Sequence, residues 1–224
     1  MIQIKIEIIV IVIFLLFFVI GHFYTYIKRS KVQKALTNLL EKNNFDEFDN
    51  LCNKKMIQRL FPLFSLWMMK LNYLIDNEDL SQADTMFTKI DQLKLNTLQA
   101  REYYSKGFYY HLKRRNQQKC LYYLNNFKQV GTNQNEKEKM EELYQIVIEK
   151  NISLLDKVLS RLKEKEPIER YQDEYLISKI YENMGDASSA EEYKDKAILH
   201  KKQFDIAIER FQFDKERSSN KMNF

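Results

Sequence analysis

The hydrophobic pattern divides the chain into an apolar opening and a long remainder with helical periodicity. From Ile8 to Ile27 no side chain carries a formal charge, and Lys28, Arg29, Lys31 and Lys34 follow. At ~1.5 Å per residue, a helix over this run would be roughly 30 Å long, about the thickness of the hydrocarbon layer of a bilayer. The opening therefore predicts a single membrane-spanning anchor with a basic flank.

The residues at the end of this run predict where the anchor meets the membrane surface. Aromatic rings favour headgroup depth, and basic side chains just beyond them reach lipid phosphates, including those of anionic lipids. The expected interface residues are Phe23, Tyr24, Tyr26, Lys28, Arg29, Lys31 and Lys34. A cleaved signal peptide is the alternative, but the run is too long and aromatic residues stand where a small-residue cleavage site is needed. Because more basic residues follow the run than precede it, the rest of the chain is expected on the cytoplasmic face.

Beyond the basic flank, apolar residues recur at helical spacing and predict five helical hairpins. The first has stripes from Val32 to Leu40 and from Phe45 to Cys52, separated at Asn43 and Asn44. The other four are expected from about Pro62 to Ile90, Thr97 to Phe127, Glu136 to Leu162 and Pro167 to Leu199. One residue after each turn recurs at intervals of 35, 37, 35 and 35, namely Phe48, Ala83, Cys120, Leu155 and Ala190. A period of this size is typical of stacked helix pairs.

Composition supports an all-α fold. The chain has only four glycines and two prolines, which leaves little material for the turns between strands. The prolines, Pro62 and Pro167, stand where helices are expected to begin. The predicted architecture is an N-terminal transmembrane helix, an α-solenoid of about five hairpins and a C-terminal capping helix. The corresponding segments are 1–29 for the anchor, 30–200 for the array and 201–224 for the capping helix with a frayed tail.

The chain shows no recognisable pattern for catalysis or metal binding. It contains no Gly-rich phosphate loop and no HExxH or GxSxG motif, and its three histidines are scattered. Cys52 and Cys120 match no CxxC or zinc spacing and are expected to be small buried hydrophobic residues. The net charge of +5 is mild and both signs are interleaved, which argues against a dedicated nucleic-acid surface. The sequence therefore predicts a protein that is not an enzyme and holds no metal or cofactor.

The fifth hairpin carries a resemblance to a known family. Between Tyr175 and Ala197 it has small residues at Ser178, Ala190 and Ala197, an aromatic ring at Tyr181 and a turn glycine at Gly185. In this spacing it resembles the tetratricopeptide repeats. The second hairpin matches at Trp67, Ala83 and Phe87 but has Lys70 and Leu71 in place of the expected apolar and small pair. The resemblance covers roughly residues 31 to 200, and the first and fourth hairpins depart from the pattern; a generic helical array is the alternative.

The resemblance implies a concave groove, lined by the first helices of the hairpins, that receives an extended or helical peptide. Carried over position by position, the groove residues are Met68, Asn72, Asp76, Tyr109, Lys113, Tyr144, Tyr175, Lys179 and Asn183. No successive-hairpin arrangement of Lys and Asn like the family's clamp for chaperone tails is present. The expected function is a membrane-anchored, non-enzymatic scaffold that recruits a protein or peptide partner at the cytoplasmic face.

Two alternatives stay open. The same array could lie outside the membrane and assist the folding or assembly of envelope or secreted proteins. It could also be a membrane-tethered RNA binder that uses Lys113 to Arg115 and the neighbouring tyrosines, although these rings and charges are explained more simply by packing and by a solvated turn. The sequence does not identify the partner or the oligomeric state.

Overall fold

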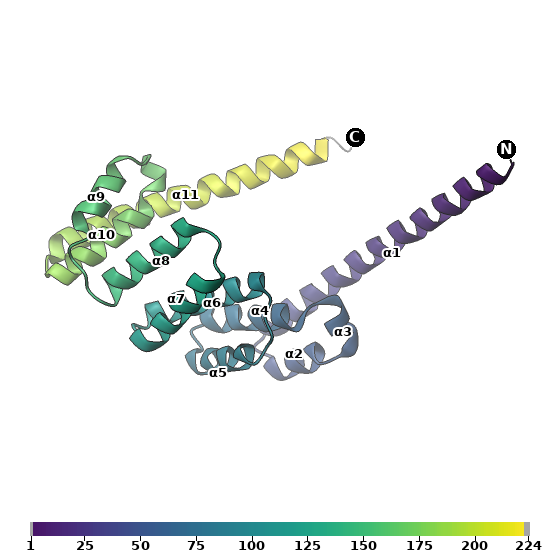
Figure 1. Cartoon of the computed structure of the whole chain (residues 1–224), viewed down its shortest axis with the longest axis horizontal. Helices are drawn as coiled ribbons and strands as arrows, with labels where there is room; N and C mark the ends of the chain where they lie inside the picture. Colours follow the sequence, from purple (N-terminus) through teal and green to yellow (C-terminus); the bar gives the residue numbers. More distant parts are fainter. Residues whose placement is uncertain (1, 222–224) are drawn as a thin grey trace. The chain divides into compact units, whose positions relative to one another are not determined.

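A computed structural model describes the backbone of residues 2–221 and the side-chain surroundings of residues 15–211 (Figure 1). Every regular element in this part of the chain is a helix, so the all-α prediction is confirmed. The elements are α1 (Ile2–Glu41), α2 (Phe45–Cys52), α3 (Lys55–Leu60), α4 (Leu63–Asp76), α5 (Leu80–Asp91), α6 (Thr97–Lys113), α7 (Gln117–Val130), α8 (Gln134–Val147), α9 (Leu155–Lys163), the 3₁₀ helix η1 (Pro167–Glu169), α10 (Tyr171–Met184) and α11 (Ala187–Lys221).

The predicted membrane anchor is wrong for the described part of the chain. No helix there is both long enough and apolar enough to cross a bilayer. The span was expected to begin at Ile8, and the side chains of residues 8–14 lie outside the described part. The apolar stretch that remains, Leu15 to Ile27, is shorter than the ~20 residues that a crossing requires and runs into Lys28 and Arg29. The transmembrane, single-pass and cytoplasmic-face assignments depended on this anchor and are corrected with it.

The chain forms two compact units, Met1–Gln99 (unit 1) and Ala100–Phe224 (unit 2). Each unit has its own cluster of buried apolar side chains. The unit 1 cluster consists of Leu36, Leu40, Phe48, Cys52, Ile57, Phe61 and Leu66. A unit 2 cluster consists of Ile146, Val158, Leu176, Ile177 and Ile180. Burial of apolar surface in these clusters supplies the main stabilisation of each unit.

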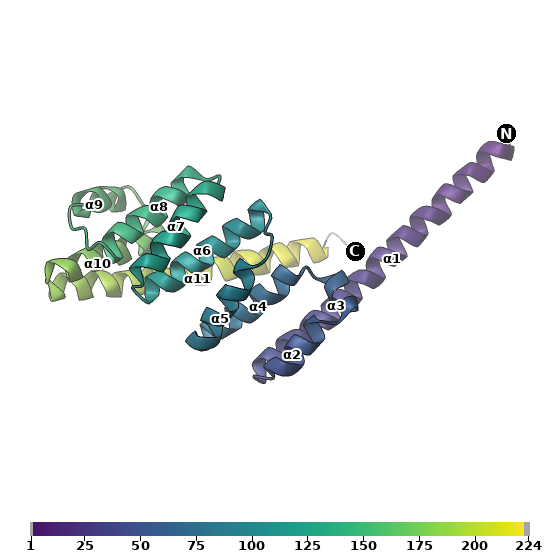
Figure 2. The ribbon, with the colours of Figure 1, turned by 60° about the horizontal axis from the view of Figure 1, so that its bottom comes forward.

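In unit 1, α4 and α5 pack along each other and are visible side by side in Figure 2. The buried ammonium group of Lys70, on α4, makes an ion pair of 2.8 Å with Asp49. It also lies 5.2 Å from the ring centre of Phe45 and 5.9 Å from that of Phe48. These contacts compensate the cost of burying a charge, which explains how Lys70 stands where an apolar residue was expected.

The predicted hairpin turns coincide with breaks between helices, and each contains one residue in the left-handed region. These residues have φ between 52° and 81° and are Asn43, Glu78, Arg115, Lys150 and Gly185. Their spacing reproduces the intervals of 35, 37, 35 and 35 found in the sequence. In each turn the next residue is Asn or Asp, namely Asn44, Asp79, Asn116, Asn151 and Asp186. Four of these side chains accept a hydrogen bond from a backbone N–H three residues later, as helix N-caps do.

In unit 2, the contact between α6 and α7 depends on the absence of a side chain at Gly107. A Cβ atom at this position would clash with the ring of Tyr123 on α7. Tyr123 in turn shares a 3.2 Å hydrogen bond with the hydroxyl of Tyr103, which is fully buried. Cys120 is also buried, as predicted, and its thiol is 3.9 Å from the carbonyl oxygen of Phe108.

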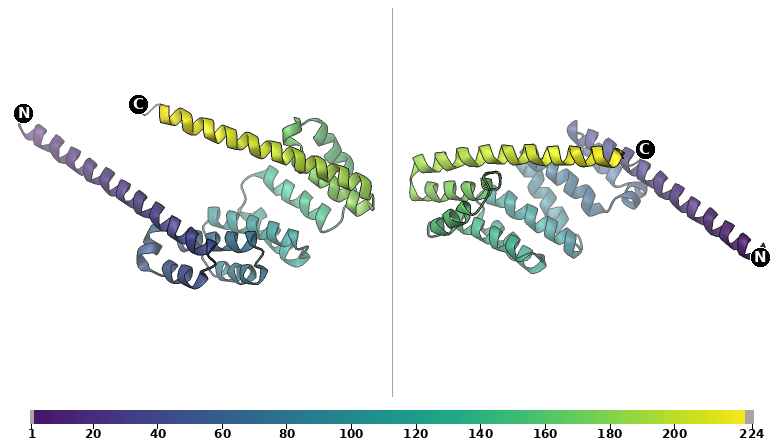
Figure 3. Two further views of the ribbon diagram at one scale, coloured as in Figure 1. Left: turned by 180° about the vertical axis from the view of Figure 1, so that it is seen from behind. Right: turned by 90° about the horizontal axis from the view of Figure 1, so that it is seen from above.

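The helices α10 and α11 form the most extensive helix pair of unit 2. The helix α11 is continuous from Ala187 to Lys221, and Figure 3 shows it extending well past α10. A hairpin helix and a separate capping helix were expected in its place. The two merge because the chain has no Gly or Pro between Ala187 and Lys221 to end a helix. Residues 222–224 of the predicted frayed tail lie outside the described part of the chain.

Candidate functional site

A groove of about 870 Å³ lies within unit 2. Its walls come from α6, α8, α10 and α11, with one residue from α9. Four residues predicted from the sequence line it, and they are Tyr109, Lys113, Tyr175 and Lys179. We call this site the Tyr–Lys groove.

The four residues form two rows with the same spacing. Tyr109 and Lys113 are one helical turn apart on α6, and Tyr175 and Lys179 are one turn apart on α10, so each pair projects from one face of its helix. Both tyrosines are solvent-exposed, at 49% for Tyr109 and 42% for Tyr175. Partial burial and the nearby Glu136 carboxylate raise the pKa of Tyr109, so its hydroxyl stays protonated and can donate a hydrogen bond.

Apolar side chains also line the groove. Leu143 and Val147 come from α8, Leu176 from α10 and Ile198 from α11. Ile198 is 59% exposed, so its side chain remains largely uncovered in the groove. An apolar surface with tyrosines and cationic groups around it suits a ligand that has both apolar and polar groups.

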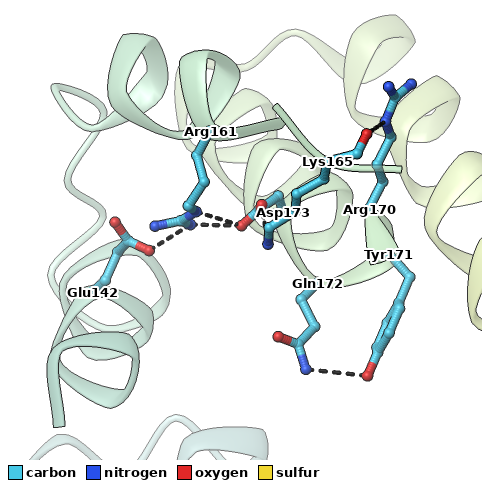
Figure 4. A network of polar contacts seen from close by, with 7 residues as sticks. All are labelled: Glu142, Arg161, Lys165, Arg170, Tyr171, Gln172 and Asp173. Atoms are coloured by element: carbon cyan, nitrogen blue, oxygen red, sulfur yellow. Dashed lines mark hydrogen bonds and ion pairs between the residues drawn. The ribbon is translucent and has the colours of Figure 1, made fainter. Parts of the chain in front are cut away.

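A network of charged residues fixes one wall of the groove (Figure 4). Arg161 of α9 donates hydrogen bonds to Glu142 of α8 at 2.7 Å and to Asp173 of α10 at 2.6 and 2.9 Å. Lys157 adds an ion pair of 3.1 Å to Glu142, and Lys165 adds one of 2.6 Å to Asp173. Burial opposes the charge on Arg161, but its hydrogen bonds to Asp173 and Glu142 outweigh this effect and raise its pKa above the ordinary value. The network therefore holds three helices together with its charges compensated.

The next turn of the chain is held by smaller contacts that are also visible in Figure 4. The guanidinium of Arg170 donates a 2.8 Å hydrogen bond to the carbonyl of Lys165, and the amide of Gln172 donates one of 3.1 Å to the hydroxyl of Tyr171. The ring of Tyr171 also packs against Phe204 of α11, with 5.3 Å between ring centres. This ring contact connects the start of α10 to α11.

Two further predicted residues belong to unit 2 but have structural roles. Tyr144 is 4% exposed, and burial raises the pKa of its hydroxyl. The amide of Asn183 donates a 2.8 Å hydrogen bond to the backbone carbonyl of Ile146 and so connects α10 to α8. Neither side chain lines the groove.

The remaining predicted groove residues belong to α4 of unit 1 and do not line the Tyr–Lys groove. Met68 is buried at 3% exposure, Asn72 is half-buried and Asp76 is exposed. The tetratricopeptide resemblance assigns the first helix of every hairpin to one groove. In the structure, α4 belongs to unit 1, whereas the groove residues of α6 and α10 belong to unit 2.

The residues expected at a membrane surface lie on α1. Phe23, Tyr24 and Tyr26 are between 64% and 66% exposed. The ammonium group of Lys28 lies 5.8 Å from the ring centre of Tyr24, and the guanidinium of Arg29 lies 5.0 Å from that of Phe61. Lys31 and Lys34 are exposed.

Sequence reasoning missed several groove residues. Lys139 of α8, Arg161 of α9, and Lys194 and Ile198 of α11 all line the site. A partial signal exists on α11, where Lys194, Ile198 and Lys201 follow at spacings of four and three and share one helix face. Nothing in the spacing indicates that this face turns toward α6 and α8, because that depends on tertiary packing.

The three basic residues from Lys113 to Arg115, which were considered for RNA binding, do not all line the groove. Lys113 and Arg115 line the groove, whereas Arg114 donates a 2.7 Å hydrogen bond to the hydroxyl of Tyr110 and lies over its ring. Within the described residues, no three His, Cys, Asp or Glu side chains are placed to hold a metal ion.

Comparison with known protein families, with curated proteins and with solved structures finds no match. The resemblance to tetratricopeptide repeats therefore stays a prediction. The chemistry and geometry of the groove are therefore the features of this chain that bear on its function.

Proposed function

We propose that the protein is a non-enzymatic interaction module and that its Tyr–Lys groove binds a short segment of a partner protein. The observation that carries the proposal is the groove of about 870 Å³ with two Tyr and Lys rows beside an apolar surface. A groove of this size holds several side chains of a bound peptide. Tyrosine contributes a large contact area with one polar end, and lysine can contact carboxylates or backbone carbonyls. The tetratricopeptide resemblance points to the same use of such a groove.

The geometry favours a binding role because the buried carboxylates of the groove are engaged with Arg161. Glu142 and Asp173 are both less than 5% exposed and accept hydrogen bonds from Arg161. A carboxylate held in this way serves to position helices, because Arg161 and a lysine already occupy its oxygens.

The test is selection of peptides from a displayed random library on the full chain, followed by affinity measurements on the selected peptides. The groove variant is Tyr109→Ala/Lys179→Glu. The matched control is Tyr122→Ala/Lys119→Glu, which makes the same two changes on α7 outside the groove; Tyr122 is 49% exposed, as Tyr109 is.

We expect the selected peptides to bind the wild type and the control alike and to bind the groove variant at least about tenfold more weakly. Circular dichroism would verify that both variants remain helical. Equal binding to the groove variant, or no peptide selected at all, would overturn the proposal.

A further inference from the structure

The charges around the Tyr–Lys groove are strongly unequal. Five cationic side chains that line it lie outside the Arg161 network, and they are Arg115, Lys139, Lys179, Lys194 and Lys201. They come from α8, α10, α11 and the turn after α6, so several elements contribute positive charge to the groove. Three carboxylates also line the site, namely Glu136, Glu142 and Asp173.

The three carboxylates are engaged elsewhere. Glu136 accepts a hydrogen bond of 2.5 Å from Arg101. Glu142 and Asp173 are buried and paired with Arg161, and each has a further lysine partner. These ion pairs compensate cations other than the five, whose positive potential is therefore available to a ligand.

Four of the five cations have partners that are exposed or shared. Lys194 pairs with Glu191, and Lys201 with Asp205, each within one turn of the exposed helix α11. Exposed pairs of this kind stabilise little, so a ligand carboxylate can replace them. Lys179 at 2.5 Å and Arg115 at 4.0 Å share the single carboxylate of Glu182. Among the described residues, Lys139 has no ion-pair partner.

A groove lined by cations could bind either of two common polyanions, a nucleic acid or an acidic peptide. The apolar residues of the groove indicate which of these ligands fits better. Leu143, Val147 and Ile198 line the groove together with the cations, and aliphatic side chains of a peptide pack on such residues. A nucleic acid would need aromatic stacking surfaces along its path, whereas Tyr109 and Tyr175 lie in two separate rows. The combination fits a peptide better than a nucleic acid.

On this charge complementarity we infer that the ligand of the Tyr–Lys groove is an acidic peptide, with Asp or Glu side chains on either side of an aliphatic residue. The inference rests on the proposed function and specifies its partner chemistry. The aliphatic residue packs on Leu143, Val147 and Ile198, and the carboxylates pair with the five cations.

The experiment measures fluorescence anisotropy of short labelled peptides with the full chain. One peptide alternates glutamate with leucine, and its counterpart has glutamine in place of each glutamate. The charge variant is Lys139→Glu/Lys194→Glu. The control, Lys119→Glu/Lys163→Glu, makes the same change in net charge at two exposed lysines outside the groove.

We expect the glutamate peptide to bind at least about tenfold more tightly than the glutamine peptide, and to lose that advantage in the charge variant but not in the control. Its affinity should also fall as salt is raised, because exposed charges are screened.

Equal binding of the two peptides would overturn the acidic inference and leave the proposed function intact. The same conclusion would follow if the chain binds library-selected peptides but does not bind the glutamate peptide. Failure of the library-selected peptides as well would overturn the proposed function. A single-stranded RNA could also be tested as the ligand. If it binds more tightly than the glutamate peptide and loses affinity in the charge variant, the acidic-peptide inference is overturned and the ligand is a nucleic acid.

Discussion

Arg161 connects three helices through one guanidinium group. It belongs to α9, and its hydrogen bonds reach Glu142 on α8 and Asp173 on α10. Both carboxylates are almost completely buried. A planar group with five N–H donors suits this role, since it can serve two carboxylates at once in a fixed geometry. Lysine at the same position would act as a point charge and could not reproduce this arrangement.

Arg161→Met should lower the free energy of unfolding by about 2 kcal/mol, because it leaves two buried carboxylates with one cation fewer. Lys157 and Lys165 remain as partners and limit the loss. Urea denaturation measures the effect. Lys163→Met, at an exposed position on the same helix, is the control and should change stability by less than about 0.5 kcal/mol. Equal effects of the two substitutions would show that the network contributes nothing.

At the scale of the element, the turns carry the repeat more clearly than the helices do. Each of the five turns has a residue with positive φ followed by Asn or Asp. Glycine adopts this conformation without strain, as at Gly185, whereas a residue with a Cβ pays roughly 1 kcal/mol. Glu78, Arg115 and Lys150 accept this cost, and their turns are held in place by the packing of the helices that they join.

Lys150→Gly should raise the free energy of unfolding by about 0.5 kcal/mol, since glycine removes the strain of the left-handed conformation but adds entropy to the unfolded chain. Gly185→Ala should lower it by about 1 kcal/mol for the reverse reason; a Cβ at Gly185 meets open space, so the cost is conformational. Urea denaturation again measures both. Lys150→Ala, which keeps the Cβ, should have almost no effect, and a gain equal to that of Lys150→Gly would contradict the explanation.

At the scale of the whole molecule, the chain consists of two compact units, each with its own apolar core. Each unit also contains one buried cysteine, Cys52 in unit 1 and Cys120 in unit 2. Burial raises the pKa of each thiol to about 12, with a smaller contribution from Asp49 at Cys52. The reactive thiolate form is therefore suppressed in the folded chain.

The two thiols should react with iodoacetamide only slowly in the native chain near pH ~8, and rapidly once urea unfolds the unit that contains them. Mass spectrometry of labelled peptides measures each site separately. Cys52→Ala leaves Cys120 as the single thiol, and Cys120→Ala leaves Cys52, so each variant reports on one unit. Fast labelling of either thiol without denaturant would show that its unit is open in solution.

The sequence predicted the helices well and the groove in part. Apolar periodicity and the Asn or Asp caps are local signals, so the turns at Glu78, Arg115 and Lys150 could be read directly. Tyr109 and Lys179 were identified because the resemblance to tetratricopeptide repeats implies that their helix positions line a groove. Lys139, Arg161 and Ile198 were missed, because their place in the groove depends on the direction in which α8, α9 and α11 face.

The sequence by itself determined the all-helical class, the hairpin turns and the burial of both cysteines, since propensity, periodicity and capping act over a few residues. Tertiary structure alone decided the division into two units, the ion network around Arg161 and the set of cations around one groove. These features join residues that are distant in the chain, as in the bond between Asn183 and Ile146. Such contacts form only when helices pack, and no local pattern specifies which faces meet.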